Sequence, residues 1–175
     1  KSRFYQIDIS KDGLDMLNDL PESIDGLLYC PGSINLKPFN RLSSQDFLND
    51  FNQNVLGAVS LIQKLLPNLK SANGASIVLF STVAAKLGMH FHASVATAKA
   101  AIEGLAKSLA AEFAASKIRV NVIAPSLTDT PLACSLLNTN EKKEASAKRH
   151  PLQRGGNTSY IAQLVSFLLS DKSSW

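Results

Sequence analysis

The sequence has few cysteines, a low share of charged residues and no long apolar run, and each shortage excludes a class of protein. The two cysteines, Cys30 and Cys134, have neither metal-ligand spacing nor a disulfide framework, which predicts reduced thiols, no metal site and a cytoplasmic location. No apolar run approaches the roughly 18 residues of a membrane span. The net charge is +4, and the one basic group, within 142–149, also carries acidic residues. We therefore expect no membrane and no nucleic acid as partner.

What the chain does have is an alternation of strand and helix patterns. Four short runs have the length and apolar content of strands, at 4–9, 24–30, 75–80 and 118–124. Apolar residues at helical spacing predict four helices, over 11–20, 43–66, 94–113 and 158–169. We expect Ser43 with Asp46 to cap the second helix, Pro67 and Asn73-Gly74 to end it, and Thr158 to cap the last one. A polar segment, 128–156, precedes that last helix.

This alternation predicts an α/β fold, with a Rossmann-type doubly wound parallel sheet and helices on both faces, in a single domain over 1–175. In such sheets ligands bind beyond the carboxyl ends of the strands. The residues that follow the strands therefore matter most, and they are Asp8, 30–32, 81–83 and 125–130.

The motifs at these positions resemble those of the short-chain dehydrogenase/reductase family over essentially the whole chain. YCPGS at 29–33 stands where the family has Asn-Asn-Ala-Gly and keeps only the glycine, while NVLG at 54–57 matches a mid-helix Asn-Val-x-Gly. NVIAPSLTDTPL at 121–132 is similar to the family's Asn-x-x-x-Pro-Gly-x-x-x-Thr, and 150–171 resembles its C-terminal signature.

The resemblance implies an oxidoreductase that transfers a hydride between the nicotinamide of NAD or NADP and a small carbonyl or alcohol substrate. The segment IVLFSTVAA at 77–85 places the family's catalytic hydroxyl at Thr82, and SVATAK at 94–99 places its lysine at Lys99. Asn54 corresponds to the asparagine of the catalytic group. The cofactor-binding positions implied in the same way are Asp8, Gly32, Lys99, Pro125, Thr128 and Thr130.

The family's proton donor is missing from its usual position. The family pattern is Tyr-x-x-x-Lys, but Val95 stands four residues before Lys99 and can neither give nor take a proton. His92 lies seven residues before Lys99, so on a continued helix it would share that face, about two turns away, and imidazole titrates near neutral pH. His90 and Ser94 are weaker candidates. On the alternative interpretation, both histidines are ordinary loop residues.

Two functions therefore remain open, namely an enzyme with a rearranged acid and a catalytically silent dinucleotide-binding or scaffold subunit of the same fold. Retention of Asn54, Thr82 and Lys99 favours the enzyme. The valine at 95, and Ser126 in place of a glycine, favour the silent subunit.

The resemblance also implies a homodimer or homotetramer that associates through the helices over 44–70 and 94–114. The family's glycine-rich first βα unit and its last strand have no counterpart in the sequence. We therefore expect the fold to be incomplete at both ends.

Overall fold

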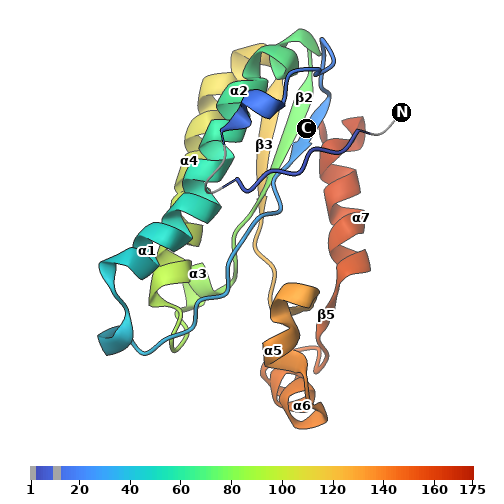
Figure 1. Ribbon diagram of the computed structural model, residues 1–175. Coiled ribbons are helices and arrows are strands. Elements are labelled where there is room, and N and C mark those ends of the chain that lie inside the picture. The colour runs from blue at the N-terminus through green and yellow to red at the C-terminus, as the bar shows by residue number, and fades with distance from the viewer. Residues whose placement is uncertain (1–2, 10–12) are drawn as a thin grey trace.

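The computed structural model describes residues 3–9 and 13–175. Three parallel strands form the main sheet in chain order: β1 (Gly26–Leu28), β2 (Ala75–Phe80) and β3 (Ile118–Ile123). Helices α2 (Gly57–Ser71) and α4 (Ala93–Phe113) lie on one face of the sheet, and α7 (Thr158–Leu169) lies on the other (Figure 1). The predicted α/β fold with a Rossmann-type parallel sheet and helices on both faces is confirmed.

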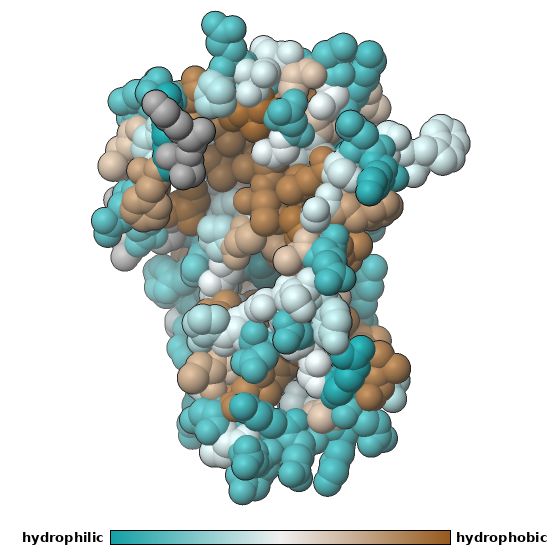
Figure 2. Space-filling view, turned by 90° about the vertical axis from the view of Figure 1, so that its right-hand side faces the viewer, coloured by the Kyte–Doolittle hydropathy of each residue, from teal (hydrophilic) through white to brown (hydrophobic). Residues whose placement is uncertain are grey.

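Each face of the sheet has its own apolar cluster, because side chains alternate along a strand. Ile77 and Leu79 of β2 pack with Ile62 and Ile102 from the two long helices. Val78, between them, points to the other side and packs with Val165 of α7. Figure 2 faces the α7 side of the molecule and shows that apolar side chains also gather on that surface.

Polar side chains of the sheet bind the carboxyl end of α7. The Ser76 hydroxyl donates to the carbonyl oxygen of Leu168 at 2.7 Å, and the Arg119 guanidinium donates to the same oxygen at 2.8 Å. Arg119 also donates to the carbonyl oxygen of Ser170 at 3.0 Å. Cationic donors suit the carbonyl groups that a helix leaves unpaired at its end, so these bonds fix α7 against β2 and β3.

The long helical region begins with the predicted cap and continues past the predicted stop. Ser43 and Asp46 form a capping box at the start of α1 (Ser44–Phe51), which leads through a π-helical segment, η3 (Asn52–Leu56), into α2. Pro67 lies inside α2 and does not end it, contrary to the prediction. A proline removes one backbone donor, and buried Leu65 and Leu69 hold the turns around it on the sheet. The helix ends only before Asn73 and Gly74, which both have positive φ.

The N-terminal predictions are largely wrong. No strand forms in the described part of 4–9, and β1 has three residues instead of the seven of 24–30. A strand needs an adjacent strand to accept and donate its backbone hydrogen bonds, and residues 3–9 pair with no strand among the described residues. Of the helix predicted over 11–20, the described residues form one 3-10 turn, η1 (Leu14–Met16), which buries no side chain. So short a helix is marginal without packing.

The remaining helices are better matched, and the polar segment has more structure than predicted. Asn157, and not Thr158, caps α7 with its side chain. Residues 128–157 hold a parallel pair of two-residue strands and the helices α5 and α6. The additional elements are η2 (Phe39–Arg41), α3 (Ala84–Leu87), η4 (Ala114–Ser116), β4 (Thr128–Asp129), η5 (Pro131–Ala133), α5 (Cys134–Leu137), α6 (Asn140–Arg149), β5 (Gly156–Asn157) and η6 (Asp171–Ser173). Within residues 3–9 and 13–175, no helix has the length and apolar content to cross a membrane.

Candidate functional site

A cleft of about 1730 Å³ opens beyond the carboxyl ends of the three strands. It is bordered by the segments that follow β1, β2 and β3, by the start of α4, and by parts of α6 and α7. The predicted site residues that line it are Gly32, Thr82, His92, Lys99, Pro125, Thr128 and Thr130. The fold thus brings together side chains that are up to 98 positions apart in the sequence, from 32 to 130.

Lys99 is the buried cation of this cleft. Its side chain comes from the second turn of α4, only 8% of the residue is exposed, and Nζ donates to the carbonyl oxygen of Phe80, the last residue of β2, at 3.0 Å. Burial lowers the pKa of Lys99 to about 8, while the charges of Asp50 and Cys30 act in the opposite direction. The ammonium is therefore held at the end of the central strand with donors still available to a ligand.

Asn54 lies behind the cleft wall, within the π-helical segment η3. Its Nδ2 donates to the carbonyl oxygen of Asp50 at 2.8 Å and to the Ser33 hydroxyl at 2.9 Å. Its Oδ1 is buried and has no hydrogen-bond partner among the described residues. A buried acceptor is normally satisfied, and single π-helical turns are frequent at functional sites, so this oxygen marks a position for a donor from outside the described protein.

Lys99 and Asn54 both border one small space beside Gly32. A Cβ added at Gly32 would lie 3.4 Å from Lys99 Nζ and 3.6 Å from Asn54 Oδ1. A larger side chain there would occupy the volume that both polar atoms border. With a hydrogen in place of a side chain, a cation and an unsatisfied acceptor face the same space.

Ser81 and Thr82, the two hydroxyl residues that follow β2, have different hydrogen-bond partners and different roles. Ser81 is buried and its Oγ bonds the Glu103 carboxylate at 2.8 Å, so it ties β2 to α4. Thr82 lines the cleft, and its Oγ1 accepts from the backbone N–H of Ala84 at 3.3 Å. The Thr82 hydroxyl hydrogen has no acceptor among the described residues and is the donor available to a bound molecule.

The position of the missing tyrosine is apolar in space as well as in sequence. Val95 is buried at the cleft wall, and Ser94 beside it turns away and donates to the Asp50 carboxylate. His92 borders the cleft but precedes the first turn of α4 as its N-cap residue, so the predicted continuation of the helix back to it is wrong. Its Nδ1 lies 2.6 Å from the carbonyl oxygen of His90. A carbonyl only accepts, so Nδ1 carries hydrogen and Nε2 is the atom left for proton exchange.

The segment after β3 forms the opposite wall of the cleft. The Pro125 carbonyl oxygen accepts from the N–H of Val83 at 3.2 Å, which joins the segments after β3 and β2. The Thr128 hydroxyl donates to the Ser126 carbonyl oxygen at 3.1 Å, and Thr130 caps η5. The contacts of Thr128 and Thr130 are local, whereas the Pro125 bond ties this wall to the segment after β2.

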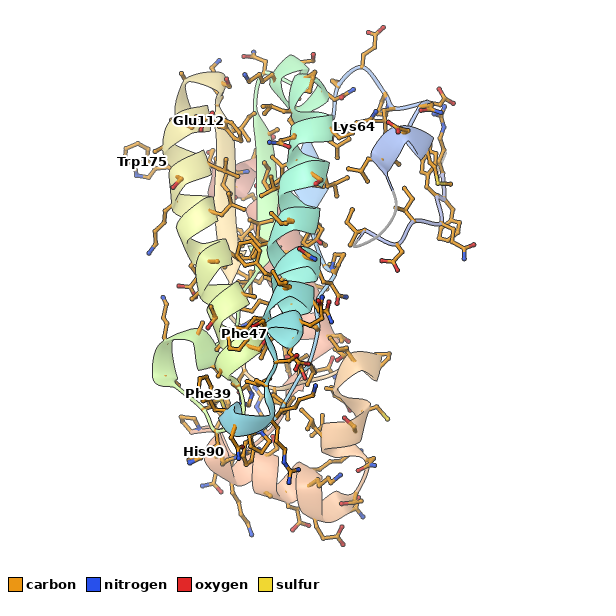
Figure 3. All side chains as sticks on the ribbon, turned by 60° about the vertical axis from the view of Figure 1, so that its left-hand side comes forward. Phe39, Phe47, Lys64, His90, Glu112 and Trp175 are labelled. Atoms are coloured by element: carbon orange, nitrogen blue, oxygen red, sulfur yellow. The ribbon has the colours of Figure 1, made fainter. Side chains whose placement is uncertain are left out.

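Two predicted residues do not line the cleft. Asp8 is exposed in the segment 3–9 and is not among the residues that line it. Asn54 does not line it either, and reaches it through the space at Gly32. The weaker candidate His90 does border the cleft and is exposed, in the lower part of the molecule in Figure 3, where Phe39 also lies.

Sequence reasoning missed a buried carboxylate, Asp50, which is 2% exposed. Its Oδ1 accepts from the Ser33 hydroxyl at 2.5 Å, and its Oδ2 accepts from Ser94. Asp50 stands four residues before Asn54, on the same face of the helical region. A polar pair at this spacing, within a series of apolar residues, was the signal in the sequence.

Comparison with known proteins places the chain among reductases and dehydrogenases. Residues 10–175 match a family model described as enoyl-(acyl carrier protein) reductase. The chain is 33% identical over 144 residues to a tropinone reductase homolog of Arabidopsis thaliana. This alignment covers 82% of this chain and 55% of the relative. It is 32% identical over 177 residues to a 3-oxoacyl-(acyl-carrier-protein) reductase of Chlamydia pneumoniae. That alignment covers 98% of this chain and 71% of the relative.

Solved structures agree with this placement. A short chain dehydrogenase family protein from Francisella tularensis superposes with a TM-score of 0.82 at 29% identity, over 92% of this chain and 69% of the other. The chain thus spans about half of the length of the Arabidopsis relative and about two thirds of the Francisella protein.

The lowered pKa of Lys99 has a consequence for stability. The group titrates at about 8 in the folded chain and at 10.5 when unperturbed, so the unfolded chain binds more protons between these values, and the free energy of unfolding rises with pH across that window. We expect Lys99→Met to remove this rise, at most about 3 kcal/mol, in denaturant unfolding at pH 7.5 and pH 10. Lys107→Met, which removes an exposed lysine from the same helix, should keep it. Equal slopes for parent and Lys99→Met would contradict the assignment.

Proposed function

The chain belongs to the short-chain dehydrogenase/reductase family, and we propose that it is an NAD(P)(H)-dependent oxidoreductase acting on a small carbonyl or alcohol substrate. The observation that carries the proposal is the space beside Gly32, where the Lys99 ammonium and the unsatisfied Asn54 Oδ1 face each other. Thr82 offers a free hydroxyl hydrogen in the same cleft. A pure scaffold has no need of these three groups around one cavity.

The residues present fit the polar part of a nicotinamide dinucleotide. A ribose hydroxyl both donates and accepts, so one such group can donate to Asn54 Oδ1 and accept from Lys99 Nζ. The cleft is also large enough, at about 1730 Å³, for a dinucleotide and a small substrate. We therefore assign binding of NAD or NADP to Gly32, Lys99, Pro125, Thr128 and Thr130. Asp8 is proposed only as a residue at the adenine end, outside the cleft lining.

When bound, the nicotinamide supplies or accepts the hydride. The chain's own residues hold and polarise the substrate. The Thr82 hydroxyl donates to the substrate oxygen, which favours the negative charge that develops there during reduction. Lys99 keeps its positive charge next to that oxygen and holds the ribose in place, so the cofactor and substrate stay oriented.

His92 is the group we propose as proton donor. In its protonated form Nε2 carries a hydrogen that can pass to the substrate oxygen, while the bond from Nδ1 to His90 keeps the ring oriented. A water held near Asn54 is the other source of the proton that we propose. Either source would supply the proton that the valine at position 95 cannot donate.

A second function, a catalytically silent nucleotide-binding subunit, is favoured by one observation. Val95 presents an apolar wall where the family has its acid, and the hydroxyl of Ser94 is bonded to Asp50 instead of facing the cleft. Such a protein would bind the dinucleotide without transferring hydride.

We also propose that the protein is a cytoplasmic homodimer or homotetramer. Leu48 and Leu56, on the outer side of the α1–α2 region, are 52% and 46% exposed, and a shallow apolar groove runs between α1 and α4. Burial of such side chains against a second copy follows the common symmetric pattern. Cys30 and Cys134 are both exposed and unpaired, as suits a reducing compartment.

Nucleotide binding is the first test. Binding to the native state raises the melting temperature by mass action, so NADH or NADPH at millimolar concentration should stabilise the full-length protein. Gly32→Val should abolish that rise, because its side chain fills the space beside Lys99. Gly155→Val, where an added Cβ meets nothing within 4 Å, should retain it. If neither nucleotide raises the melting temperature of the parent, the cofactor assignment is wrong.

The catalytic roles are tested by single substitutions. We expect Thr82→Ala to lower kcat by on the order of 10²–10³, as for loss of an oriented donor, whereas Thr97→Ala, on the exposed side of α4, should leave it unchanged. His92→Phe should cause a comparable loss if imidazole is the donor and a mild one if water is.

Val95→Tyr distinguishes the enzyme from the silent subunit. A phenol one turn before Lys99 would have its pKa lowered by the neighbouring ammonium and could transfer the proton. Activity that exists only after this substitution would identify the natural protein as silent. Parent turnover that is lost in Thr82→Ala would identify it as an enzyme.

The oligomeric state is tested on the full-length chain by light scattering. We expect a dimer or tetramer at micromolar concentration, and Leu48→Glu should dissociate it because a charge would enter the apolar contact. Leu152→Glu changes a more exposed leucine outside these helices (66% exposed) and should have no effect. A monomeric parent would refute the assembly.

A further inference from the structure

Asp50 is a buried charge that the proposed reaction does not use. It lies in the last turn of α1 at 2% exposure, and both carboxylate oxygens accept hydrogen bonds from hydroxyls, Ser33 on one side and Ser94 on the other. No ion pair within the described residues includes it. A buried carboxylate is costly without a compensating charge, so a cation that interacts with it electrostatically is central to what Asp50 does.

That cation is Lys99. Asp50 is the largest electrostatic influence that favours the charged form of the Lys99 ammonium and opposes the effect of burial. Lys99 Nζ itself donates to a neutral carbonyl oxygen, that of Phe80. The two charges therefore interact through space, without an ion pair between them among the described residues that would occupy the donors of Lys99.

The hydrogen bonds of Asp50 also reach the site. Ser33, which directly follows Gly32, donates to Asp50 and accepts from Asn54 Nδ2 at 2.9 Å. The same Nδ2 donates to the backbone oxygen of Asp50 at 2.8 Å. With its amide nitrogen held in this way, Asn54 must direct Oδ1 toward the space at Gly32. The bond from Ser94 joins the first turns of α4, which carry Lys99, to the same carboxylate.

An asparagine has one acceptor oxygen and could serve only one of the two serine hydroxyls. The carboxylate therefore supplies a second acceptor and a negative charge. We propose, on the basis of the proposed function, that Asp50 is a positioning residue that acts through Lys99 and Asn54, keeping the ammonium charged and directing the amide oxygen toward the cofactor's sugar hydroxyls.

The other titratable groups around Lys99 are few among the described residues. Cys30, from the segment after β1, favours the charged ammonium only as a thiolate, and burial raises the pKa of that thiol. Glu103, one turn further along α4, bonds Ser81 and pairs with Lys86 of α3 at 3.6 Å. Asp50 is therefore the carboxylate whose removal should change the protonation of Lys99.

The test is an NMR titration of the lysine side-chain carbons and nitrogens in the full-length protein, with the Lys99 signal assigned by its loss in Lys99→Met. Asp50→Asn keeps the size and one of the two acceptor oxygens but removes the charge, and should move the Lys99 midpoint down by about one pH unit. Ser94→Ala removes a hydrogen bond from the same carboxylate, keeps the charge, and should leave the midpoint in place. An unchanged midpoint in Asp50→Asn would overturn the proposal.

Binding of NADPH and NADH provides a second, independent test of the proposal. Asp50→Asn should weaken nucleotide binding several-fold more at pH 8 than at pH 6, because only at the higher pH does the variant lose the Lys99 charge. A merely structural role would weaken binding equally at both values, as we expect for Ser94→Ala. If no nucleotide binds the parent at all, the proposed function fails, while the NMR result still decides whether Asp50 controls the charge of Lys99.

The parent protein keeps the proposal testable if Asp50→Asn does not fold. The carboxyl carbon of Asp50 should then show a second inflection at the pH where Lys99 titrates, near 8, because the two charges interact. Lys99→Met should remove that inflection. A carboxyl signal in the parent that is insensitive to the Lys99 titration would refute the coupling.

Discussion

The structure of the site depends on one constraint, the burial of the Lys99 ammonium at the end of the central strand. Burying a charge is unfavourable unless donors and counter-charges surround it, and the chain meets this need with the Phe80 carbonyl oxygen and the charge of Asp50. Satisfying the ammonium in this way brings together β2, α1 and α4. It also leaves Nζ beside Gly32, where a ligand can use its remaining donors.

The absence of a tyrosine at position 95 changes how the proton would move but not how the cofactor would be held. Val95 closes the cleft wall, and the adjacent hydroxyl, Ser94, belongs to the Asp50 network. The groups that would bind the sugar and polarise the substrate are separate from that wall: Lys99, Asn54 and Thr82. Loss of the acid would therefore leave binding intact, so an enzyme with a relocated donor and a silent binder would share nearly the same site.

The central part of the fold could be predicted because its signals are local and strong. The almost wholly apolar β2, the regular spacing of α4 and the Ser43–Asp46 cap each depend on a few neighbouring residues. The predictions for 4–9 and Pro67 failed because the outcome depends on partners distant in the sequence. A strand needs a neighbouring edge, and a helix continues through a proline when its other residues are buried.

The candidate site likewise has features that could be predicted from the sequence and features that arise only from contacts between distant residues. Its position beyond the strand ends followed from topology, and the identity of Thr82 and Lys99 followed from motifs. The Asp50 network was not predicted, because Ser33, Asp50 and Ser94 have no motif in common and meet only after folding. The role of His92 was predicted on a continued helix, but the residue lies just before α4 begins.

The central claim is that a nucleotide sugar occupies the space between Lys99 and Asn54. A crystal structure of the full-length protein with NADPH tests it most directly. The account predicts a ribose hydroxyl within hydrogen-bond distance of both Lys99 Nζ and Asn54 Oδ1, beside an unobstructed Gly32. A bound nucleotide that leaves Asn54 Oδ1 without a partner, or that contacts neither residue, would contradict it.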